Sequence, residues 1–187
     1  MLITGIGGQG IQLAAQVLAR AATLEGRNVM YLGLYGGMMR GGNTEATVVF
    51  ADDAVESPPT VGRTWSAILM HHDYSAPTIA LLRPGSLALV NTSVFEGDVT
   101  STGATVLDVN ATELAGSVGN PLAAAMVMAG AYTAATGLVA LDSLVDGVAA
   151  SLPPYRQQHV EVNVAALRAG FEAAPRDIAP AWELSPC

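Results

Sequence analysis

The sequence predicts an α/β protein with a single-domain, Rossmann-like three-layer fold, in which helices flank a mostly parallel sheet. Three observations support this prediction. The chain has 187 residues, which suits one domain with a sizeable core. An apolar run near the start meets a glycine cluster and then a helical pattern. Strand patterns fill the first half of the chain, and helical patterns accumulate in the second.

The first elements form a strand, a tight turn and a helix. Leu2 to Thr4 is a short apolar strand, and apolar residues then recur at helical spacing from Ile11 until Gly26. Asn28 to Leu34 is rich in Val, Met, Tyr and Leu and predicts a second strand. For such a βαβ beginning, parallel pairing of the two strands with a right-handed crossover is the default.

The later elements follow from turn signals and periodicity. Asn120 before Pro121 is a capping pair that begins a long Ala-rich helix. One domain is expected over 1–174, followed by a Pro-rich C-terminal tail over 175–187 that lies on the surface. Further strands are expected at 44–50, 65–70, 86–90 and 104–109, and further helices at 74–82, 112–118, 141–152 and 156–173.

The segment 121–141 carries no charge and is long enough to span a bilayer. It consists mostly of Ala, Gly and Thr, with few residues of the strongly membrane-favouring types, so a buried helix is the better interpretation. Met1 is followed at once by a strand, without the features of a signal peptide. The expected compartment is therefore the cytoplasm.

Composition limits the partners and the chemistry. The formal net charge is −8, lysine is absent and the basic residues are scattered, so no nucleic-acid partner is expected and a lysine Schiff base is excluded. Apolar residues make up 51% of the chain, which favours a surface partly hidden against partner chains. The single cysteine, Cys187, cannot supply the thiolates of an iron–sulfur cluster.

The most informative motif is the glycine loop, Gly5-Ile6-Gly7-Gly8-Gln9-Gly10, placed between a strand and a helix. In that context glycines let phosphate approach backbone N–H groups at the positive helix end, but they can equally serve close packing of the helix on the strand. An NAD site also needs an acidic residue near the end of the second strand, where this chain has Tyr35. Glu25 lies at the end of the preceding helix and should not reach, so independent dinucleotide binding is disfavoured.

A second glycine-rich loop carries Arg40-Gly41-Gly42 just past the carboxyl end of a strand. Open α/β sheets bind ligands on this side, so Arg40 is a candidate contact for a phosphate, a carboxylate or an acidic partner residue. An ordinary loop ion pair with Glu45 is an equally good interpretation.

His71-His72-Asp73 suggests a metal or acid–base cluster, but adjacent strand residues point to opposite faces. Both imidazoles are therefore not expected to share an ion, and no metal site is predicted. No complete catalytic set is visible in the sequence, so no catalytic residue is assigned to this chain.

The glycine loop with its Ala-rich helix, Tyr35-Gly36 and Arg40-Gly41-Gly42 together resembles the gamma subunit of 2-oxoacid:acceptor (ferredoxin) oxidoreductases. This group includes the pyruvate, 2-oxoglutarate, 2-oxoisovalerate, phenylglyoxylate and indolepyruvate enzymes. The similarity extends in weaker form over nearly the whole chain. Met38 stands where the family often has glutamate, and the strand near Ser66 lacks a frequent Ala-Asp start.

The resemblance implies a multisubunit enzyme that oxidatively decarboxylates a 2-oxoacid, normally to acyl-CoA. Thiamine diphosphate with Mg²⁺ is expected on thiamine-binding alpha and beta subunits, and the iron–sulfur clusters on a ferredoxin-like subunit. This chain is expected to be a non-redox subunit, inactive alone, on the coenzyme A or substrate side of the site. The residues implied for that side are Gly5, Gly7, Gly8, Gln9, Gly10, Tyr35, Arg40, Gly41, Gly42 and Asn120.

Two other functions remain open from the residues. The chain can be a free-standing nucleotide-binding regulatory or dehydrogenase domain. It can also be a purely structural assembly subunit, whose glycine loops make only packing contacts.

Overall fold

The computed structural model describes residues 1–36, 41–56 and 58–182. Its described part contains six strands and six α-helices, and most of the predicted elements are present. The strands are β1 (Leu2–Ile6), β2 (Asn28–Tyr35), β3 (Asn43–Ala51), β4 (Thr64–Leu69), β5 (Leu82–Asn91) and β6 (Thr105–Val109).

The helices lie mostly after the strands, as predicted. Three short 3-10 turns join them, η1 (Thr100–Thr102), η2 (Pro121–Ala123) and η3 (Pro154–His159). The α-helices are α1 (Ile11–Leu24), α2 (Ala76–Ala80), α3 (Ala111–Ser117), α4 (Ala124–Thr136), α5 (Leu141–Ser151) and α6 (Val160–Ala173).

The six strands form one sheet in the order β2-β3-β1-β4-β5-β6. The pairs β1 with β4, β4 with β5 and β5 with β6 are parallel. The pairs β1 with β3 and β2 with β3 are antiparallel. The predicted mostly parallel α/β sheet is confirmed, with an antiparallel strand inserted near one edge.

The expected parallel pairing of the first two strands was wrong. β3 lies between β1 and β2 and is hydrogen-bonded to both. The glycine-rich connection after Tyr35 is too short for a crossover, so the chain turns back as a hairpin. At its base Gly36 N donates to the Asn43 carbonyl at 2.7 Å. The returning strand occupies the position beside β1 that the βαβ default assigned to β2.

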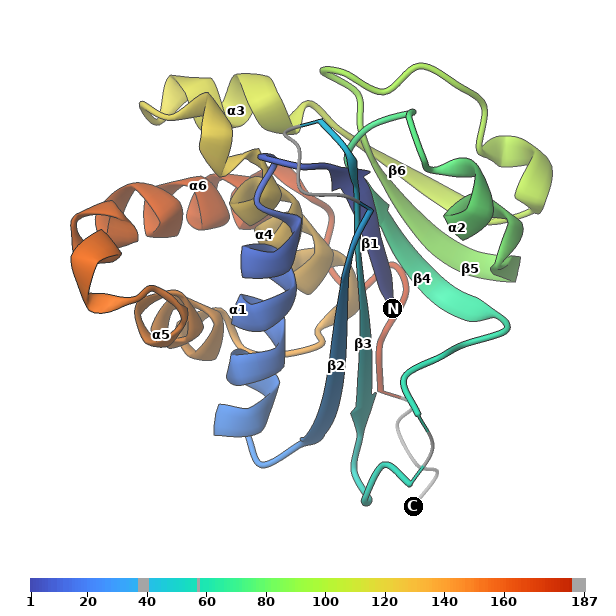
Figure 1. Cartoon of the computed structure of the whole chain (residues 1–187), viewed down its shortest axis with the longest axis horizontal. Coiled ribbons are helices and arrows are strands. Elements are labelled where there is room, and N and C mark those ends of the chain that lie inside the picture. The colour runs from blue at the N-terminus through green and yellow to red at the C-terminus, as the bar shows by residue number, and fades with distance from the viewer. Residues whose placement is uncertain (37–40, 57, 183–187) are drawn as a thin grey trace.

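Helices cover the two faces of the sheet unequally. Ile3 of β1 belongs to the larger core, which is completed by α1, α3, α4, α5 and α6, whereas Leu2 belongs to a smaller core on the opposite face. Figure 1 shows α1, α4, α5 and α6 on one side of the sheet and the short α2 on the other. The alternation of neighbouring residues between the two cores is the period-two pattern of a strand that is buried on both faces.

Most of the uncharged segment 121–141 forms the predicted buried helix, α4, which η2 precedes and a non-helical connection to α5 follows. Every residue of α4 is buried, and the helix passes through the larger core. Within the described part of the chain, no helix combines the length and the apolar character that crossing a membrane requires.

The helix expected at 74–82 is much shorter than predicted. α2 ends at Ala80, and β5 starts at Leu82, so that it includes Pro84 and Gly85 ahead of the predicted strand at 86–90. The pairing register with β4 shifts between Thr64 and Ser66, opposite this part of β5. A strand tolerates proline at such an irregularity because the ladder loses no hydrogen bond there.

The described part of the C-terminal tail follows the end of α4. Asp177 N donates to the Ala134 carbonyl at 2.9 Å, and Ala181 N donates to the Thr136 carbonyl at 2.7 Å. Trp182 Nε1 donates to the Leu138 carbonyl at 2.9 Å. These bonds satisfy carbonyl groups near the C-terminus of α4, which have no partner inside a helix.

Candidate functional site

The glycine loop lies at the edge of the sheet where β1, β4 and β5 end, and it leads directly into α1 (Figure 1). Gly10 is the N-cap of α1 with a left-handed backbone (φ 80°), and no side chain caps the helix. The first N–H groups of a helix have no partner within it, and they carry the positive end of the helix dipole. The start of α1 therefore offers backbone donors to an anionic group.

Gly5 has a packing function. A Cβ atom at this position would lie 2.9 Å from Ile11 Cδ1 and 2.9 Å from Met70 Cβ, so no larger residue fits between β1, α1 and the end of β4. Gly5 is also paired with Thr44 inside the sheet. The packing interpretation of the glycine motif therefore applies to its first glycine.

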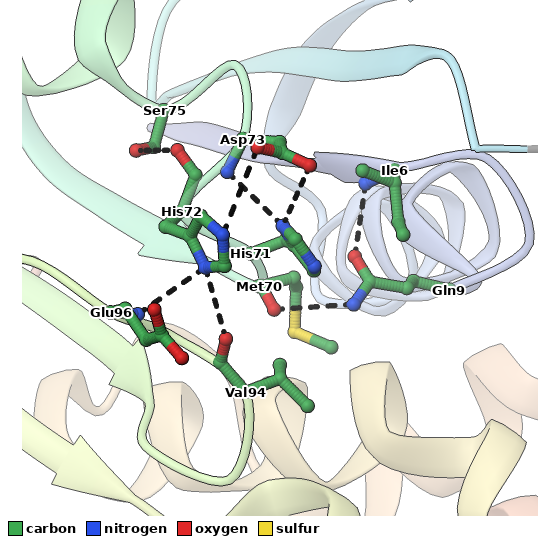
Figure 2. A network of polar contacts seen from close by, with 9 residues as sticks. All are labelled: Ile6, Gln9, Met70, His71, His72, Asp73, Ser75, Val94 and Glu96. Atoms are coloured by element: carbon green, nitrogen blue, oxygen red, sulfur yellow. Dashed lines mark hydrogen bonds and ion pairs between the residues drawn. The ribbon is translucent and has the colours of Figure 1, made fainter.

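Gln9 fixes the loop to the neighbouring strand. Its Oε1 accepts from Ile6 N at 3.0 Å, and its Nε2 donates to the Met70 carbonyl just beyond β4 at 3.2 Å. Both polar ends of the side chain are used within the protein, as Figure 2 shows. Gln9 is accordingly a positioning residue for the loop.

The structure brings the two predicted glycine-rich segments together. Gly7 N donates to the Gly42 carbonyl at 2.8 Å, and Gly41 N donates to the Gly7 carbonyl at 3.3 Å. Gly41 has a φ of 83°, a left-handed conformation that favours glycine. Arg40 and Met38 lie outside the described residues, but the residues that follow Arg40 contact the glycine loop directly.

Two pockets flank the glycine loop, and Gly7 and Gly8 line both of them. The first, of about 330 Å³, lies between the start of α1 and the antiparallel hairpin and includes the exposed Tyr35. The second, of about 320 Å³, lies on the other side of the loop, toward the end of β5 and the start of α4. Further residues at the second pocket include Val94, Thr112, Pro121 and Leu122.

Arg156 lines the candidate site, and the sequence did not point to it. It lies on η3 and lines the first pocket together with Tyr35 and residues at the start of α1. Among the residues found to line the two pockets it is the only cation. The Pro153-Pro154 break predicts an irregular turn before Arg156, but nothing local in the sequence places that turn beside the glycine loop.

Asn120 begins its helical segment as predicted. Its side-chain oxygen accepts from Leu122 N at 3.1 Å and caps η2. The two residues that follow, Pro121 and Leu122, line the second pocket. Asn120 thus lies next to the candidate site, with its oxygen engaged by the backbone.

The His-His-Asp cluster, which consists of His71, His72 and Asp73, differs from the expectation. The two imidazole rings lie 4.3 Å apart, and the ligand atoms of the three side chains lie within 4.8 Å of one another. Figure 2 shows both rings on the side of the Asp73 carboxylate. The expectation that the rings point apart was wrong because β4 ends at Leu69, so strand alternation does not apply to the turn that follows.

A polar cluster supports the wall of the first pocket. Gln12 Nε2 donates to the Glu45 carbonyl at 2.8 Å and to the Leu34 carbonyl at 3.3 Å, and Gln12 Oε1 accepts from the Tyr31 hydroxyl. Burial raises the pKa of Tyr31, and burial also raises the pKa of Glu45. Gln12 thereby ties α1 to β2 and β3 and holds the start of the helix in place.

The geometry disfavours an independent dinucleotide site, as the sequence does. Because β3 separates β1 from β2, the end of β2 is not the neighbour of the glycine loop that a ribose-binding carboxylate requires. Glu25 lies at the other end of α1, where its Oε1 accepts from Ala140 N at 2.7 Å at the start of α5. Glu25 therefore has a different function, since its carboxylate accepts a hydrogen bond from the backbone at the N-terminus of α5.

Comparison with known proteins identifies the family. Residues 1–173 match the family described as pyruvate ferredoxin/flavodoxin oxidoreductase. The chain belongs to this family. The family predicted from the paired glycine motifs is thereby confirmed, and the chain is a gamma-type subunit of a multisubunit 2-oxoacid oxidoreductase.

Individual relatives span almost the same length as this chain. It is 32% identical to the 2-oxoglutarate synthase subunit KorC of Methanothermobacter marburgensis, over 91% of this chain and 93% of the relative. It is also 32% identical to KorC of Archaeoglobus fulgidus, over 95% of this chain and 89% of that protein.

A solved structure shares the fold over a similar span. The gamma subunit of a keto/oxoacid ferredoxin oxidoreductase from Geobacter sulfurreducens is 26% identical, with a TM-score of 0.74 over 91% of this chain and 95% of that subunit. None of these comparisons favours a free-standing nucleotide-binding or dehydrogenase domain.

Proposed function

We propose that this chain forms the coenzyme A and substrate side of a composite active site in a 2-oxoacid oxidoreductase complex. The observation that carries the proposal is the glycine loop at the uncapped start of α1, with a pocket on each side. In this proposal the residues of the glycine loop line the site, and Tyr35, Arg40, Gly41, Gly42 and Asn120 surround it.

The proposed ligand fits the chemistry of the first pocket. Coenzyme A carries phosphate groups, and phosphates bind well to the free N–H groups of a helix start and to the planar fork of an arginine. Gly10 and Ile11 at the start of α1 line this pocket together with Arg156. Arg40, by its sequence position next to Gly41, is the second candidate for an anion contact.

The proposal assigns the other components to partner chains. Thiamine diphosphate with Mg²⁺ would supply the electron sink for decarboxylation, on thiamine-binding alpha and beta subunits. A ferredoxin-like subunit would hold the iron–sulfur clusters, because this sequence has a single cysteine. In that complex, placed in the cytoplasm, the residues of this chain bind and orient the substrate.

The experiment is a steady-state kinetic comparison of complexes reconstituted with variant chains. Arg156→Ala is expected to raise the KM for coenzyme A by roughly 10-fold to 100-fold, the loss typical of a charged hydrogen bond. The KM for the 2-oxoacid should change little. Arg40→Ala should act in the same direction, and Arg168→Ala, on the exposed part of α6, is the matched control.

The outcomes separate the candidate ligands. A rise in the KM for the 2-oxoacid alone would place the substrate, and not coenzyme A, beside the glycine loop. Unchanged constants for both ligands in a fully assembled Arg156→Ala, Arg40→Ala double variant would overturn the proposal. The purely structural interpretation of the glycine loops would then be the better one.

A further inference from the structure

The turn after β4 holds three potential metal ligands in a fixed arrangement. Ser75 Oγ donates to the His72 carbonyl at 2.7 Å, and Ser75 N donates to the same carbonyl at 3.3 Å. Tyr74 has a positive φ of 63°, which is uncommon for a residue other than glycine and costs conformational energy. The turn is thus held in a conformation that places His71, His72 and Asp73 side by side.

The distances within the His-His-Asp cluster are close to those of a metal site. Asp73 Oδ2 lies 3.6 Å from His71 Nδ1, and Asp73 Oδ1 lies 3.8 Å from His72 Nε2. In a tetrahedral zinc site, bonds of about 2.1 Å place neighbouring ligand atoms about 3.4 Å apart. Small rotations of the side chains therefore suffice to bring the three groups around one ion.

The surroundings of His72 prepare one of its nitrogens for coordination. Its Nδ1 lies 3.2 Å from the Val94 carbonyl, which can only accept a hydrogen bond. The Glu96 N–H lies farther from the same nitrogen, at 3.4 Å, so the closer carbonyl sets the tautomer. With the proton on Nδ1, the lone pair of Nε2 points toward Asp73, which is the usual arrangement of a metal-binding histidine.

His71 contributes the second nitrogen. Its Nδ1 accepts from Asp73 N at 3.1 Å, so this nitrogen carries a lone pair on the side of the carboxylate (Figure 2). An ion bound there takes the place of that N–H contact. The side chains of His71, His72 and Asp73 are 18%, 37% and 59% exposed, which leaves the cluster open to an ion and a water molecule from solvent.

We propose that His71, His72 and Asp73 bind one divalent transition-metal ion, with a solvent molecule in the remaining position. Two imidazoles and one carboxylate suit Zn²⁺, Co²⁺ or Ni²⁺, whereas Mg²⁺ and Ca²⁺ prefer oxygen ligands alone. The ion lies beside the glycine loop, because the Met70 carbonyl next to the cluster accepts from Gln9. The His72 ring also connects the cluster to Val94, which lines the second pocket.

The test is titration of the tag-free full chain, stripped with chelator, with Zn²⁺ and Co²⁺. Calorimetry should give one Zn²⁺ per chain, and Co²⁺ should show the visible absorption of a tetrahedral complex. His72→Ala and Asp73→Asn should each weaken binding at least about 10-fold, since each removes one of three ligands. His159→Ala, which removes the third histidine of the sequence, and Asp53→Asn, an exposed carboxylate elsewhere, are the matched controls.

Circular dichroism of each variant shows whether the fold is kept. Asp73→Asn preserves the size of the side chain, so it tests the ligand even if His72→Ala disturbs the turn. Failure of the wild-type chain to bind Zn²⁺ at micromolar concentrations overturns the proposal. The proposal is also overturned if the His72→Ala and Asp73→Asn variants bind Zn²⁺ as tightly as the wild type, or if only His159→Ala loses binding.

Discussion

At the scale of single residues, Tyr132 and Ser66 form a buried polar pair. The Tyr132 hydroxyl on α4 lies 2.9 Å from the Ser66 hydroxyl on β4, and both side chains are fully buried. Burial raises the pKa of Tyr132 above its ordinary value of 10.0, because the charged form cannot be solvated there. Ser66 lies in the strand that lacks the Ala-Asp start frequent in the family, and its side chain is a buried hydrogen-bond partner in the core.

This pair predicts a fall in stability at alkaline pH. Above about pH 10 the unfolded chain releases the Tyr132 proton, whereas the folded chain retains it, so the free energy of unfolding decreases as the pH rises. Tyr132→Phe should lose about 1 kcal/mol at neutral pH through the missing hydrogen bond, and its further decrease at high pH should be smaller than that of the wild type. Urea unfolding at about pH 8 and about pH 10.5 measures both effects.

Tyr155→Phe is the control for this prediction, because Tyr155 is 72% exposed. It should keep the full alkaline decrease of the wild type. Tyr31, whose pKa burial also raises, leaves part of the decrease in Tyr132→Phe. If Tyr132→Phe and the wild type lost the same free energy between the two pH values, the folded environment of Tyr132 would not oppose its ionisation.

Single residues of the candidate site could be predicted from the sequence only in part. The paired glycine motifs placed Gly7 and Gly42 in one site, and the structure joins them through a backbone hydrogen bond. Arg156 was not predicted, because contact between η3 and α1 depends on how distant helices pack. The directions of His71 and His72 were predicted wrongly, because the strand was expected to continue to residue 70 and ends at Leu69. Side chains in the turn that follows do not alternate between the two faces of the sheet.

At the scale of elements, α4 and α6 cross at two glycines. A Cβ atom on Gly170 would lie 2.8 Å from Val127 Cα, and one on Gly130 would lie 2.9 Å from Phe171 N. The two helices are therefore in backbone contact on both sides of the crossing. Glycine inside a helix normally costs about 1 kcal/mol, and here that cost permits close packing of two helices in the core.

Gly170→Ala is predicted to destabilise the protein by more than about 2 kcal/mol, since the added methyl group meets rigid backbone and the helices must separate. Urea or thermal unfolding of the isolated chain measures the change. Gly116→Ala on α3 is the matched control, because its methyl group would lie at an ordinary 3.7 Å from Pro121 Cγ. That control should be neutral or slightly stabilising, and an equally stable Gly170→Ala variant would contradict the close crossing.

The positions of elements were easier to predict than their order in space. Periodicity and turn residues located β1 to β6 and the long helices within a few residues, since these signals are local. The insertion of β3 between β1 and β2 could not be predicted in this way. It depends on which of two strand partners β1 accepts, and the hydrophobic pattern of β1 is compatible with both.

At the scale of the whole molecule, the described part of the C-terminal tail connects segments that are far apart in the sequence. Arg27, just before β2, stacks on the Trp182 ring with its Cζ 3.9 Å from the ring centre, and it also pairs with Asp52 after β3. Trp182 thereby connects the end of α4 to the antiparallel hairpin. These contacts lie at the end of the sheet opposite the glycine loop, so the described part of the tail does not cover the candidate site.

The composition and the site together predict that the purified chain alone has no oxidoreductase activity. Its single cysteine cannot hold an iron–sulfur cluster, so electrons from a 2-oxoacid have no acceptor within the chain. The measurement is anaerobic dye reduction with 2-oxoglutarate or pyruvate, with and without coenzyme A. The rate of the chain alone should equal the buffer background, and addition of the thiamine-binding and iron–sulfur subunits should produce activity.

The partner subunits without this chain are the control, and they should show a strongly reduced dependence on coenzyme A, because the surface proposed to bind it is missing. Substantial dye reduction by the chain alone would contradict its function as a non-redox subunit, whereas full coenzyme A-dependent activity of the partners without it would remove this chain from the site.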